Sequence, residues 1–435
     1  MLSPVNAGTR PAAAGGWHTP VPDDHPAAAY LSAAAVRRHT APLMERARHG
    51  ESDHFKWHDD RLAGTAAFVA SVIRDNYPDL KVPYHARWRH FEAGGADRWA
   101  DTAQRHGLAA LGTADPQRLE RARSRVDLAI TSVLLDAGAG PDWRYADTAT
   151  GLTLARSEGL GVASLRLFET GAFSSDPAHP LRADGKALAS FTADKLAAAF
   201  QVREDNPLVG VEGRAALIAR LGEVVQATPA VFSLACEPGK LRLGHLVDTL
   251  FLRAPTGRVA AADVLALLLR ALGPVWPSKV AVSGIWLGDC WPHPHAPGGL
   301  VPFHKLTQWL TYSLLEPLED AGLTITDLDQ LTGLPEYRNG GLLLDSGLLE
   351  PLQDSFFTTL WRVDAQPIVE WRALTVMGLD LLADAVRAEL GLSAEAFPLA
   401  RVLEGGTWAA GRRIAAQKRE GGGPPLRIEL DGTVF

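Results

Sequence analysis

The segment 304–345 carries the residues that we expect to do chemistry. It combines a lysine, a Gln-Trp pair and a Glu-Tyr-Arg triplet, namely Lys305, Gln308, Trp309, Glu336, Tyr337 and Arg338. Leucines spaced four apart predict a helix from about His304 to Glu319, with Gly322 placed to end it. The triplet follows two chain breakers and precedes a glycine pair, so it lies on tightly turned backbone that can present side chains to a ligand. The alternative is a solvated loop that only joins two helices.

A second carboxylate extends this group. Asp345 follows Glu336 by nine residues across the glycine pair, so we expect both to face one pocket. Two carboxylates in different environments can divide the roles of acid and of stabilising or nucleophilic group.

An arginine-rich segment, 83–99, is a second candidate. It contains Arg87, Trp88, Arg89 and His90 in succession. Guanidinium groups can hold a phosphate or a carboxylate through two parallel hydrogen bonds. The alternative is an ion-paired helix end.

Two further segments suggest anion binding. In 203–214 an Asn-Pro turn leads into a helix whose start can hold an anion, although a plain capped helix start explains it equally. In 404–425 glycines precede a helix, but no Gly-Lys-Ser/Thr follows, so this is not a P-loop.

The segment 284–295 brings an aspartate, a cysteine and two histidines together, namely Asp289, Cys290, His293 and His295. Such ligands suit a metal, but their spacing matches no zinc signature. Asp289, between Trp286 and Trp291, is the more attractive as a catalytic or ligand-binding carboxylate.

Bulk properties narrow the class of protein. The chain has 435 residues and a formal net charge of −7, which disfavours nucleic acid or an anionic membrane as partner. Its two cysteines exclude a disulfide framework and favour a reducing, cytoplasmic location. No apolar run is as long as a membrane-spanning helix requires. The N-terminus lacks the basic-then-apolar order of a signal peptide. Serine-hydrolase, Walker and dinucleotide motifs are absent, so no cofactor is expected.

Helical periodicity dominates the chain. We predict a mobile tail over 1–26 and one mainly helical domain over 27–435, with few short strands. Expected helices include 27–50, Asp59–Asn76, Asp115–Ala137, Leu188–Ala199, Arg214–Gln226, Leu243–Leu250, Ala260–Leu272 and Trp371–Leu390. Expected strands are Val280–Trp286 and Leu426–Leu430, the latter before an Asp431-Gly432 turn.

Six segments resemble one family across residues 27–435. They are HARWRHFEAGG (85–95), VREDNPLVGVEGRAALI (202–218), SGIWLGDCWPH (283–293), HKLTQWLTYSLLEPLEDAGL (304–323), LPEYRNGGLLLDSG (334–347) and DGTVF (431–435). The chain is similar to the uracil-catabolism protein 4 family of fungi and bacteria. That resemblance implies a role in a non-reductive pyrimidine route in which a ribosylurea-type compound is broken down to urea.

A local resemblance concerns mechanism. Lys-x-x-Gln-x-Leu at 305–310, followed by Leu331-Thr332 and then Glu336-Tyr337-Arg338, looks like the queuosine salvage glycohydrolases. Those enzymes have an α-helical fold similar to DNA glycosylases and cleave a ribosyl N-glycosidic bond. Their acid is Asp, whereas this chain has Glu336, one methylene longer.

Together the resemblances imply an N-ribosyl hydrolase acting on a ribosylurea or its 5′-phosphate, a small nucleoside- or nucleotide-derived molecule. Glu336 would stabilise the oxocarbenium-like transition state. Lys305 and Arg338 would clamp a phosphate, with help from Arg87 or Arg89. Asp289 or His90 would donate a proton to urea. Trp88, Trp309 and Tyr337 would wall the ligand.

Two alternatives remain open. One is a metal-dependent amidohydrolase-like enzyme using Asp289, Cys290, His293, His295 or His304. The other is a non-catalytic partner or ligand sensor of the ring-opening enzyme, and other enzymes of the uracil route are possible partners in either case.

Overall fold

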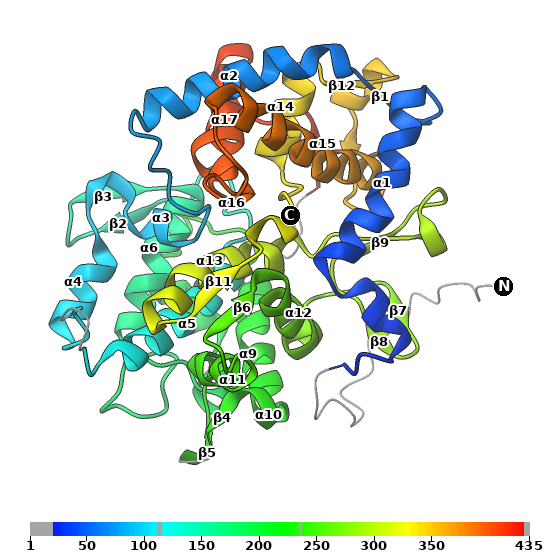
Figure 1. Ribbon diagram of the computed structural model, residues 1–435. Helices are drawn as coiled ribbons and strands as arrows, with labels where there is room; N and C mark the ends of the chain where they lie inside the picture. The colour runs from blue at the N-terminus through cyan, green and yellow to red at the C-terminus, as the bar shows by residue number, and fades with distance from the viewer. Residues whose placement is uncertain (1–20, 111–114, 235–236, 430–435) are drawn as a thin grey trace.

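Helices make up most of the chain. The structure, a computed structural model, describes residues 21–110, 115–234 and 237–429 (Figure 1). With 57% of residues helical, the expectation of a mainly α fold is confirmed. The α-helices are α1 (Ala33–His49), α2 (Leu62–Asn76), α3 (Trp88–Phe91), α4 (Arg98–Arg105), α5 (Arg118–Leu134), α6 (Arg156–Glu169), α7 (Gly185–Ala189), α8 (Ala193–Ala199), α9 (Val211–Ala227), α10 (Pro229–Phe232), α11 (Leu246–Arg253), α12 (Ala261–Leu272), α13 (Lys305–Ala321), α14 (Tyr337–Asp345), α15 (Gln366–Leu390), α16 (Leu399–Arg401) and α17 (Ala409–Lys418).

Shorter helical turns join these elements. A π-helix spans Val402–Trp408 between α16 and α17. The 3-10 turns are Pro26–Tyr30, Asp59–Arg61, Ala93–Gly95, Leu243–His245, Gly273–Val275, Pro297–Gly299, Leu328–Gln330, Asp354–Phe357 and Glu420–Gly422.

The strands of the described residues form isolated two-stranded pairs. Five pairs are antiparallel: β1 (Phe55–Trp57) with β12 (Leu349–Pro351), β2 (Tyr145–Asp147) with β3 (Leu152–Leu154), β4 (Ser233–Leu234) with β5 (Glu237–Leu241), β7 (Ala281–Val282) with β8 (Ile285–Trp286), and β9 (Cys290–Pro292) with β10 (Leu300–Pro302). Two are parallel: β6 (Arg258–Ala260) with β11 (Thr324–Thr326), and β13 (Leu360–Trp361) with β14 (Arg427–Ile428).

The core is built on the contact between α5 and α13. Nearly every residue of α13 from Thr307 to Leu318 is buried, which is typical of a helix surrounded by protein. The helix runs through Pro317 to Ala321 and ends at Gly322, whose φ of 100° provides the expected left-handed cap. On another side of the molecule α15 packs against α1 and α2.

Some predicted elements differ from the structure for local reasons. The predicted strand Val280–Trp286 is a hairpin, because Ser283 and Gly284 both adopt positive φ and reverse the chain. The predicted helix Leu188–Ala199 is two helices, because Thr192 caps a new start by accepting a hydrogen bond from the Lys195 amide.

Two predictions concern the ends of the chain, the tail over 1–26 and the strand Leu426–Leu430. Residues 1–20 of the predicted tail lie outside the described residues, whereas Val21 is buried and Pro26–Tyr30 forms a helical turn. Of the predicted strand Leu426–Leu430, Arg427–Ile428 is observed, and Leu430 and the Asp431-Gly432 turn lie outside the described residues.

The backbone after Glu336 is also not the expected glycine turn. Residues 337–345 form α14, and Gly340 and Gly341 lie inside it. Glycine is needed at 340 for space, because a Cβ there would lie 2.3 Å from Cζ2 of Trp371 on α15.

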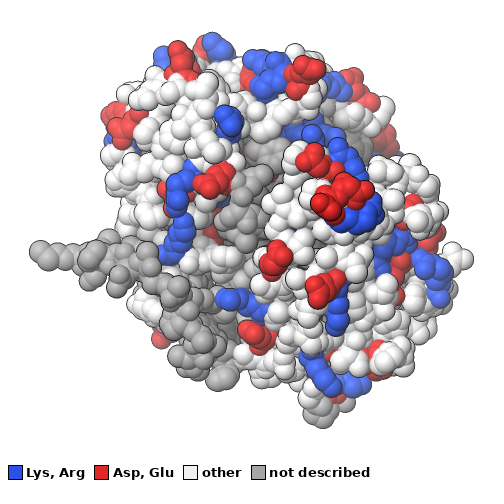
Figure 2. All heavy atoms as spheres, turned by 180° about the vertical axis from the view of Figure 1, so that it is seen from behind, with Lys and Arg blue, Asp and Glu red and all other residues white. Residues whose placement is uncertain are grey.

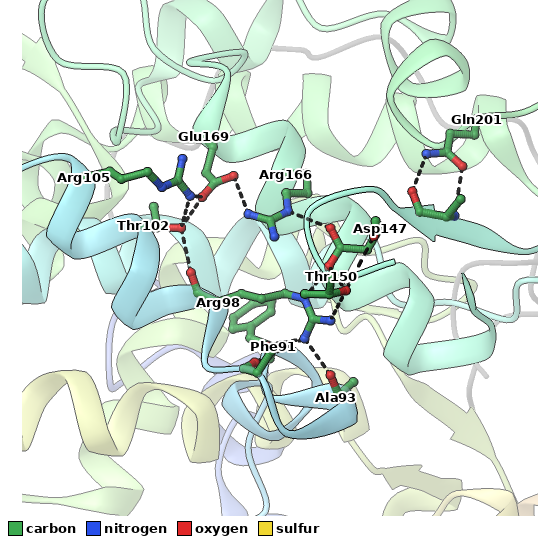
Figure 3. A network of polar contacts seen from close by, with 12 residues as sticks. Phe91, Ala93, Arg98, Thr102, Arg105, Asp147, Thr150, Arg166, Glu169 and Gln201 are labelled. Carbon is green, nitrogen blue, oxygen red and sulfur yellow. Dashed lines mark hydrogen bonds and ion pairs between the residues drawn. The ribbon is translucent and has the colours of Figure 1, made fainter. Parts of the chain in front are cut away.

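A buried ion-pair network fixes α6 (Figure 3). Arg98 of α4 donates to Asp147 at 2.7 Å and to the carbonyl of Ala93 at 2.7 Å. Arg166 of α6 donates to the other oxygen of Asp147 at 3.2 Å and to Glu169 at 2.9 Å. Because Arg98 and Asp147 are almost fully buried, the pairs hold α4, the β2–β3 hairpin and α6 in one arrangement.

The surface agrees with the modest net charge. On the face shown in Figure 2, Lys and Arg side chains are interspersed with Asp and Glu, and no extended basic area is seen. Across the described residues, no helix has both the length and the apolar character to cross a membrane.

We expect Gly340→Ala to lower the free energy of unfolding by about 1–3 kcal/mol, because the added methyl overpacks against Trp371. Gly64→Ala is the matched control, since Gly64 also lies in a helix but a Cβ there would meet nothing within 4 Å. That change should raise stability by about 0.5–1 kcal/mol. Urea unfolding of both variants checks the opposite signs, and equal effects would contradict this packing.

Candidate active site

A cavity of about 440 Å³ opens where the starts of three helices meet. Its wall includes the first residues of α6 and α13, the start of α14 and the loop 136–141 that follows α5. Residues of α17 and of the segment 423–428 complete it. The side chains with polar or aromatic chemistry are His85, His90, Asp136, Arg156, Ser157, Glu158, Lys305, Trp309, Glu336, Tyr337, Arg338, Trp408 and Arg412.

Glu336 is fixed by the helix that follows it. Its two carboxylate oxygens accept hydrogen bonds from the amides of Arg338 at 2.8 Å and Asn339 at 2.6 Å, so it is the N-cap of α14. Burial raises the pKa of Glu336 above its ordinary value of 4.5, and these two hydrogen bonds and the charge of Lys305 oppose the rise. The carboxylate is therefore held in one orientation at the cavity wall.

Lys305 lies at the first position of α13. Burial lowers the pKa of its ammonium, and the charge of Glu336 opposes that shift. The preceding residue, His304, has a φ of 52°, which turns the chain sharply into the helix.

The segment before Glu336 is tied to α13. The Gln308 amide nitrogen donates to the hydroxyl of Thr332 at 2.6 Å, and the Tyr312 hydroxyl donates to the Thr332 carbonyl at 3.0 Å. Gln308 therefore sets the place of the Glu336 segment from within the core, and it does not line the cavity.

Asp136 is the carboxylate of the loop after α5. Its Oδ2 lies 3.0 Å from Nη1 of Arg87, which is fully buried. Arg214 holds the same loop, because its guanidinium donates to the carbonyls of Leu135 at 3.0 Å, Ala137 at 2.8 Å and Gly138 at 3.0 Å. Two arginines thus fix a loop that has little regular structure of its own.

Two histidines of the cavity differ in character. His85 shares a hydrogen bond of 2.6 Å between its Nδ1 and Glu404 of the π-helix, which leaves Nε2 as its other polar atom. Burial and the charge of Arg87 lower the pKa of His90 to about 3, so its ring is neutral near pH 7.

The three arginines at the cavity wall differ in the charge of their hydrogen-bond partners and in exposure. Arg412 donates to Glu158 at 3.1 Å. Arg338 donates to the carbonyl of Gly422 at 2.8 Å, a neutral partner. Arg156 is exposed and begins α6 with a φ of 53°, and no side chain caps that helix start. The positive end of α6 and these arginines make this wall suited to an anion, whereas the first amide of α13 already donates to Asp289.

Of the residues expected from the sequence, the cavity gathers Lys305, Trp309, Glu336, Tyr337, Arg338 and His90. Arg87 lies directly behind the wall. Arg89 instead pairs with Glu316 at 3.0 Å, and Trp88 is a core residue whose indole donates to the carbonyl of Ser313 at 2.8 Å.

Asp289 and Asp345 do not line the cavity, so the expectation that Glu336 and Asp345 share a pocket is wrong. Asp345 ends α14, roughly 13 Å along the helix from Glu336, and it pairs with Arg419 at 2.7 Å. Asp289 accepts two hydrogen bonds of 2.8 Å from Arg372 and one of 3.0 Å from the Lys305 amide. Both carboxylates have structural partners that come from distant parts of the chain.

The histidines of the metal alternative have polar partners outside their own group, although the rings of His293 and His295 lie 5.8 Å apart. His293 faces Glu370 at 3.6 Å, His295 faces Asp53 at 3.0 Å, and His304 bonds the carbonyl of Tyr30. Among residues 21–110, 115–234 and 237–429, no three His, Cys, Asp or Glu side chains are grouped so that they could hold a metal ion.

Sequence reasoning did not single out Asp136, Arg156, Glu158 or Arg412. Asp136 lies in the loop after α5, and Arg156 and Glu158 lie in the first turn of α6, a helix that was not among those predicted. A possible signal was the order Asp-Ala-Gly-Ala-Gly-Pro at 136–141, a charge directly before flexible backbone at a helix end.

Comparison with known proteins assigns the chain to a family. Residues 29–435 match the model of a family described as "Protein of unknown function (DUF1688)". The chain belongs to this family. Two similar relatives are Protein urg3 of Schizosaccharomyces pombe, 39% identical over 93% of this chain and 98% of that protein, and Uracil catabolism protein 4 of Lachancea kluyveri, 36% identical over 95% and 99%. The resemblance to the uracil-catabolism protein 4 family is therefore confirmed.

We expect Asp289 to act on stability. Arg372 and further hydrogen bonds lower its pKa from 3.8 to about 2, against the effect of burial. Its charged form therefore stabilises the fold above about pH 4, and this contribution is lost as the pH falls toward 2. Asp289→Asn should lower the free energy of unfolding at pH 7 by about 2–5 kcal/mol and flatten its decrease between pH 4 and 2.

The control for this measurement is Asp60→Asn, at an aspartate whose side chain is 82% exposed. That change should alter stability by less than about 0.5 kcal/mol. Urea unfolding across the pH range checks both variants, and an unchanged pH dependence in Asp289→Asn would contradict the assignment.

Proposed function

We propose that this protein hydrolyses the N-glycosidic bond of a ribosylurea, preferably its 5′-phosphate, in the catabolism of uracil. The observation that carries the proposal is the carboxylate of Glu336, fixed by two amides at the wall of a cavity that also presents arginines and helix starts. The name of one relative, Uracil catabolism protein 4, supports the pathway.

The reaction transfers a ribosyl group to water. Oxygen of water bonds to C1′, the bond from C1′ to the urea nitrogen breaks, and that nitrogen keeps the electron pair. One proton of the water goes to a base of the protein, and the departing nitrogen receives a proton. The products are ribose, or ribose 5-phosphate, and urea.

Glu336 is suited to stabilise the positive charge that develops at C1′ and to accept the proton of the attacking water. Its oxygens are held by the amides of Arg338 and Asn339, so the carboxylate is oriented before the substrate binds. The raised pKa makes it a better base than an exposed glutamate.

The departing nitrogen needs a proton, and His85 is suited to supply it. Its Nδ1 bonds Glu404, so its protonated form offers Nε2–H to the ligand. His90 is a poor proton donor near pH 7, because its pKa is lowered to about 3. Asp289 lies outside the cavity, so His85 takes the role that the sequence suggested for these two.

A 5′-phosphate matches the cationic wall. Arg156, Arg338 and Lys305 lie at the starts of α6, α14 and α13, and the start of α6, which no side chain caps, also favours negative charge. Trp309, Tyr337 and Trp408 supply flat apolar surface for the ribose and its substituent.

We expect the pure protein to release urea from ribosylurea 5′-phosphate and Glu336→Gln to lower kcat by about 10²–10⁴-fold. The substituted glutamine amide keeps the size of the side chain but removes its charge. Asp345→Asn, at the other end of α14 and outside the cavity, is the control and should keep kcat within a factor of about three once its folding is verified. Full turnover by Glu336→Gln would refute the role of this carboxylate.

The pH profile gives a separate test. Glu336 acts in its ionised form, and its pKa lies above 4.5. The ionised fraction therefore falls as the pH decreases through this raised value. We expect the acidic limb of kcat/KM to have its midpoint above pH 4.5, and a midpoint at or below 4.5 would contradict this role.

We expect Arg156→Gln to raise KM for the phosphorylated substrate by about 10–100-fold, because one charge-assisted hydrogen bond is lost. Its effect on unphosphorylated ribosylurea should be less than about twofold. Arg203→Gln is the control, since Arg203 is exposed and lies outside the cavity. An equal effect of Arg156→Gln on both substrates would place the phosphate elsewhere.

A further inference from the structure

A hydrogen-bond acceptor and a donor, both buried at the cavity wall, have no hydrogen-bond partner among the described residues. They are Oδ1 of Asp136 and Nε1 of Trp309; Nδ1 of His90 at the same cavity and Nη2 of Arg87 behind its wall are open as well. The Asp136 side chain is 8% exposed and Trp309 is 6% exposed. Buried polar groups are normally satisfied in folded proteins, so an acceptor and a donor left open at one cavity indicate a ligand that completes them.

One guanidinium holds both groups in place. Nη1 of Arg87 lies 3.0 Å from Oδ2 of Asp136, and Cζ of Arg87 lies 5.5 Å from the centre of a Trp309 ring. Arg87 is itself fixed by the hydroxyl of Ser132 at 2.6 Å. Arg87 therefore contacts both of the residues that carry the open acceptor and the open donor.

The surroundings of both residues are ordered by further contacts. The loop of Asp136 is held by Arg214 through the carbonyls on both sides of it. Trp309 lies on α13, and the ring of His90 packs edge-on against its indole at 5.7 Å. Both residues are therefore held in place by neighbouring side chains before a ligand binds.

The chemistry of the pair defines the ligand. A carboxylate only accepts hydrogen bonds, and an indole N–H only donates one. A ligand that completes both groups must therefore present both an N–H and an oxygen acceptor. A carboxylate or phosphate group lacks the N–H and would be repelled by Asp136.

We propose that Asp136 and Trp309 form a subsite for a ureido group. The Trp309 indole donates to the ureido carbonyl, and Asp136 accepts a hydrogen bond from the terminal NH₂. This inference rests on the proposed function for the choice of a ureido group over another carbamoyl group. It separates the carboxylates by role, with Asp136 binding the departing urea and Glu336 acting at C1′.

Binding measured by calorimetry tests the subsite. The protein carries Glu336→Gln throughout, so that bound ligand is not turned over. The ligands are ribosylurea 5′-phosphate and ribose 5-phosphate, which lacks the ureido group. We expect an added Trp309→Phe change to weaken binding of the first about 5–20-fold and to alter binding of the second less than twofold.

Trp276→Phe is the matched control. The indole nitrogen of Trp276 is also buried without a partner, but this residue does not line the cavity. We expect it to leave both affinities unchanged. An added Asp136→Asn change should weaken binding of ribosylurea 5′-phosphate but not of ribose 5-phosphate. Because this variant also loses the charge opposite Arg87, its folding is checked by thermal unfolding.

The results separate this inference from the proposed hydrolysis. Trp309-dependent binding without urea release by the unmutated protein would support the subsite and refute the hydrolase. Urea release combined with equal affinity in Trp309→Phe would refute the subsite alone. The subsite would also be refuted if Trp309→Phe lowered the affinity for both ligands equally, or if ribosylurea 5′-phosphate did not bind at all.

Discussion

The buried guanidinium of Arg87 is the interaction on which the arrangement of the cavity depends. It donates to Ser132 of α5 and to the carbonyl of Ser157 at the start of α6, and it pairs with Asp136. The Arg87 amide donates to the hydroxyl of Ser313 on α13, and its guanidinium lies over Trp309 on the same helix. One side chain therefore joins two long helices, the start of a third and the loop that closes the cavity.

A charge can be buried in this way only because its partners are complete or nearly so. The same logic recurs around the site: Arg214 holds the loop after α5, the Arg98–Asp147 pair holds α6, and Arg372 holds Asp289 beneath the start of α13. These contacts bring three helix starts to one cavity. Carboxylates already occupy the starts of α14 and α13, namely Glu336 and Asp289, so the start of α6 is where a helix dipole can favour an anionic ligand. The π-helix adds Glu404, which orients His85, and Trp408 at the wall.

The sequence identified the helical class and part of the cavity because those features are local. The leucine spacing of α13 and the order of residues 305–338 already place Lys305, Trp309 and Glu336 near one another. Asp136 was missed because it is a single charge in an irregular loop that Arg87 and Arg214 hold in place. Glu158 was missed because it lies in the first turn of α6, a helix that the periodicity did not predict, where it pairs with Arg412.

Asp289 and Asp345 were predicted at the site from local patterns, but they lie outside the cavity because of partners distant in the sequence. Asp289 beside tryptophans and Asp345 after a glycine pair look like ligand-binding residues in the sequence. Their partners, Arg372 and Arg419, lie more than seventy residues away in the chain, so no local pattern reveals the ion pairs. A structural carboxylate can be distinguished from a reactive one only when the arginine that pairs with it in the folded protein is known.

The most direct test of the central claim is the fate of solvent oxygen when the protein acts on ribosylurea 5′-phosphate in ¹⁸O-labelled water. Cleavage of the N-glycosidic bond adds solvent oxygen to C1 of ribose 5-phosphate, so we expect the released urea to contain no label. The sugar is reduced immediately after quenching, because its aldehyde exchanges oxygen with water. Release of labelled carbonate with ammonia, and no intact urea, would show attack at the ureido carbonyl and would contradict the claim.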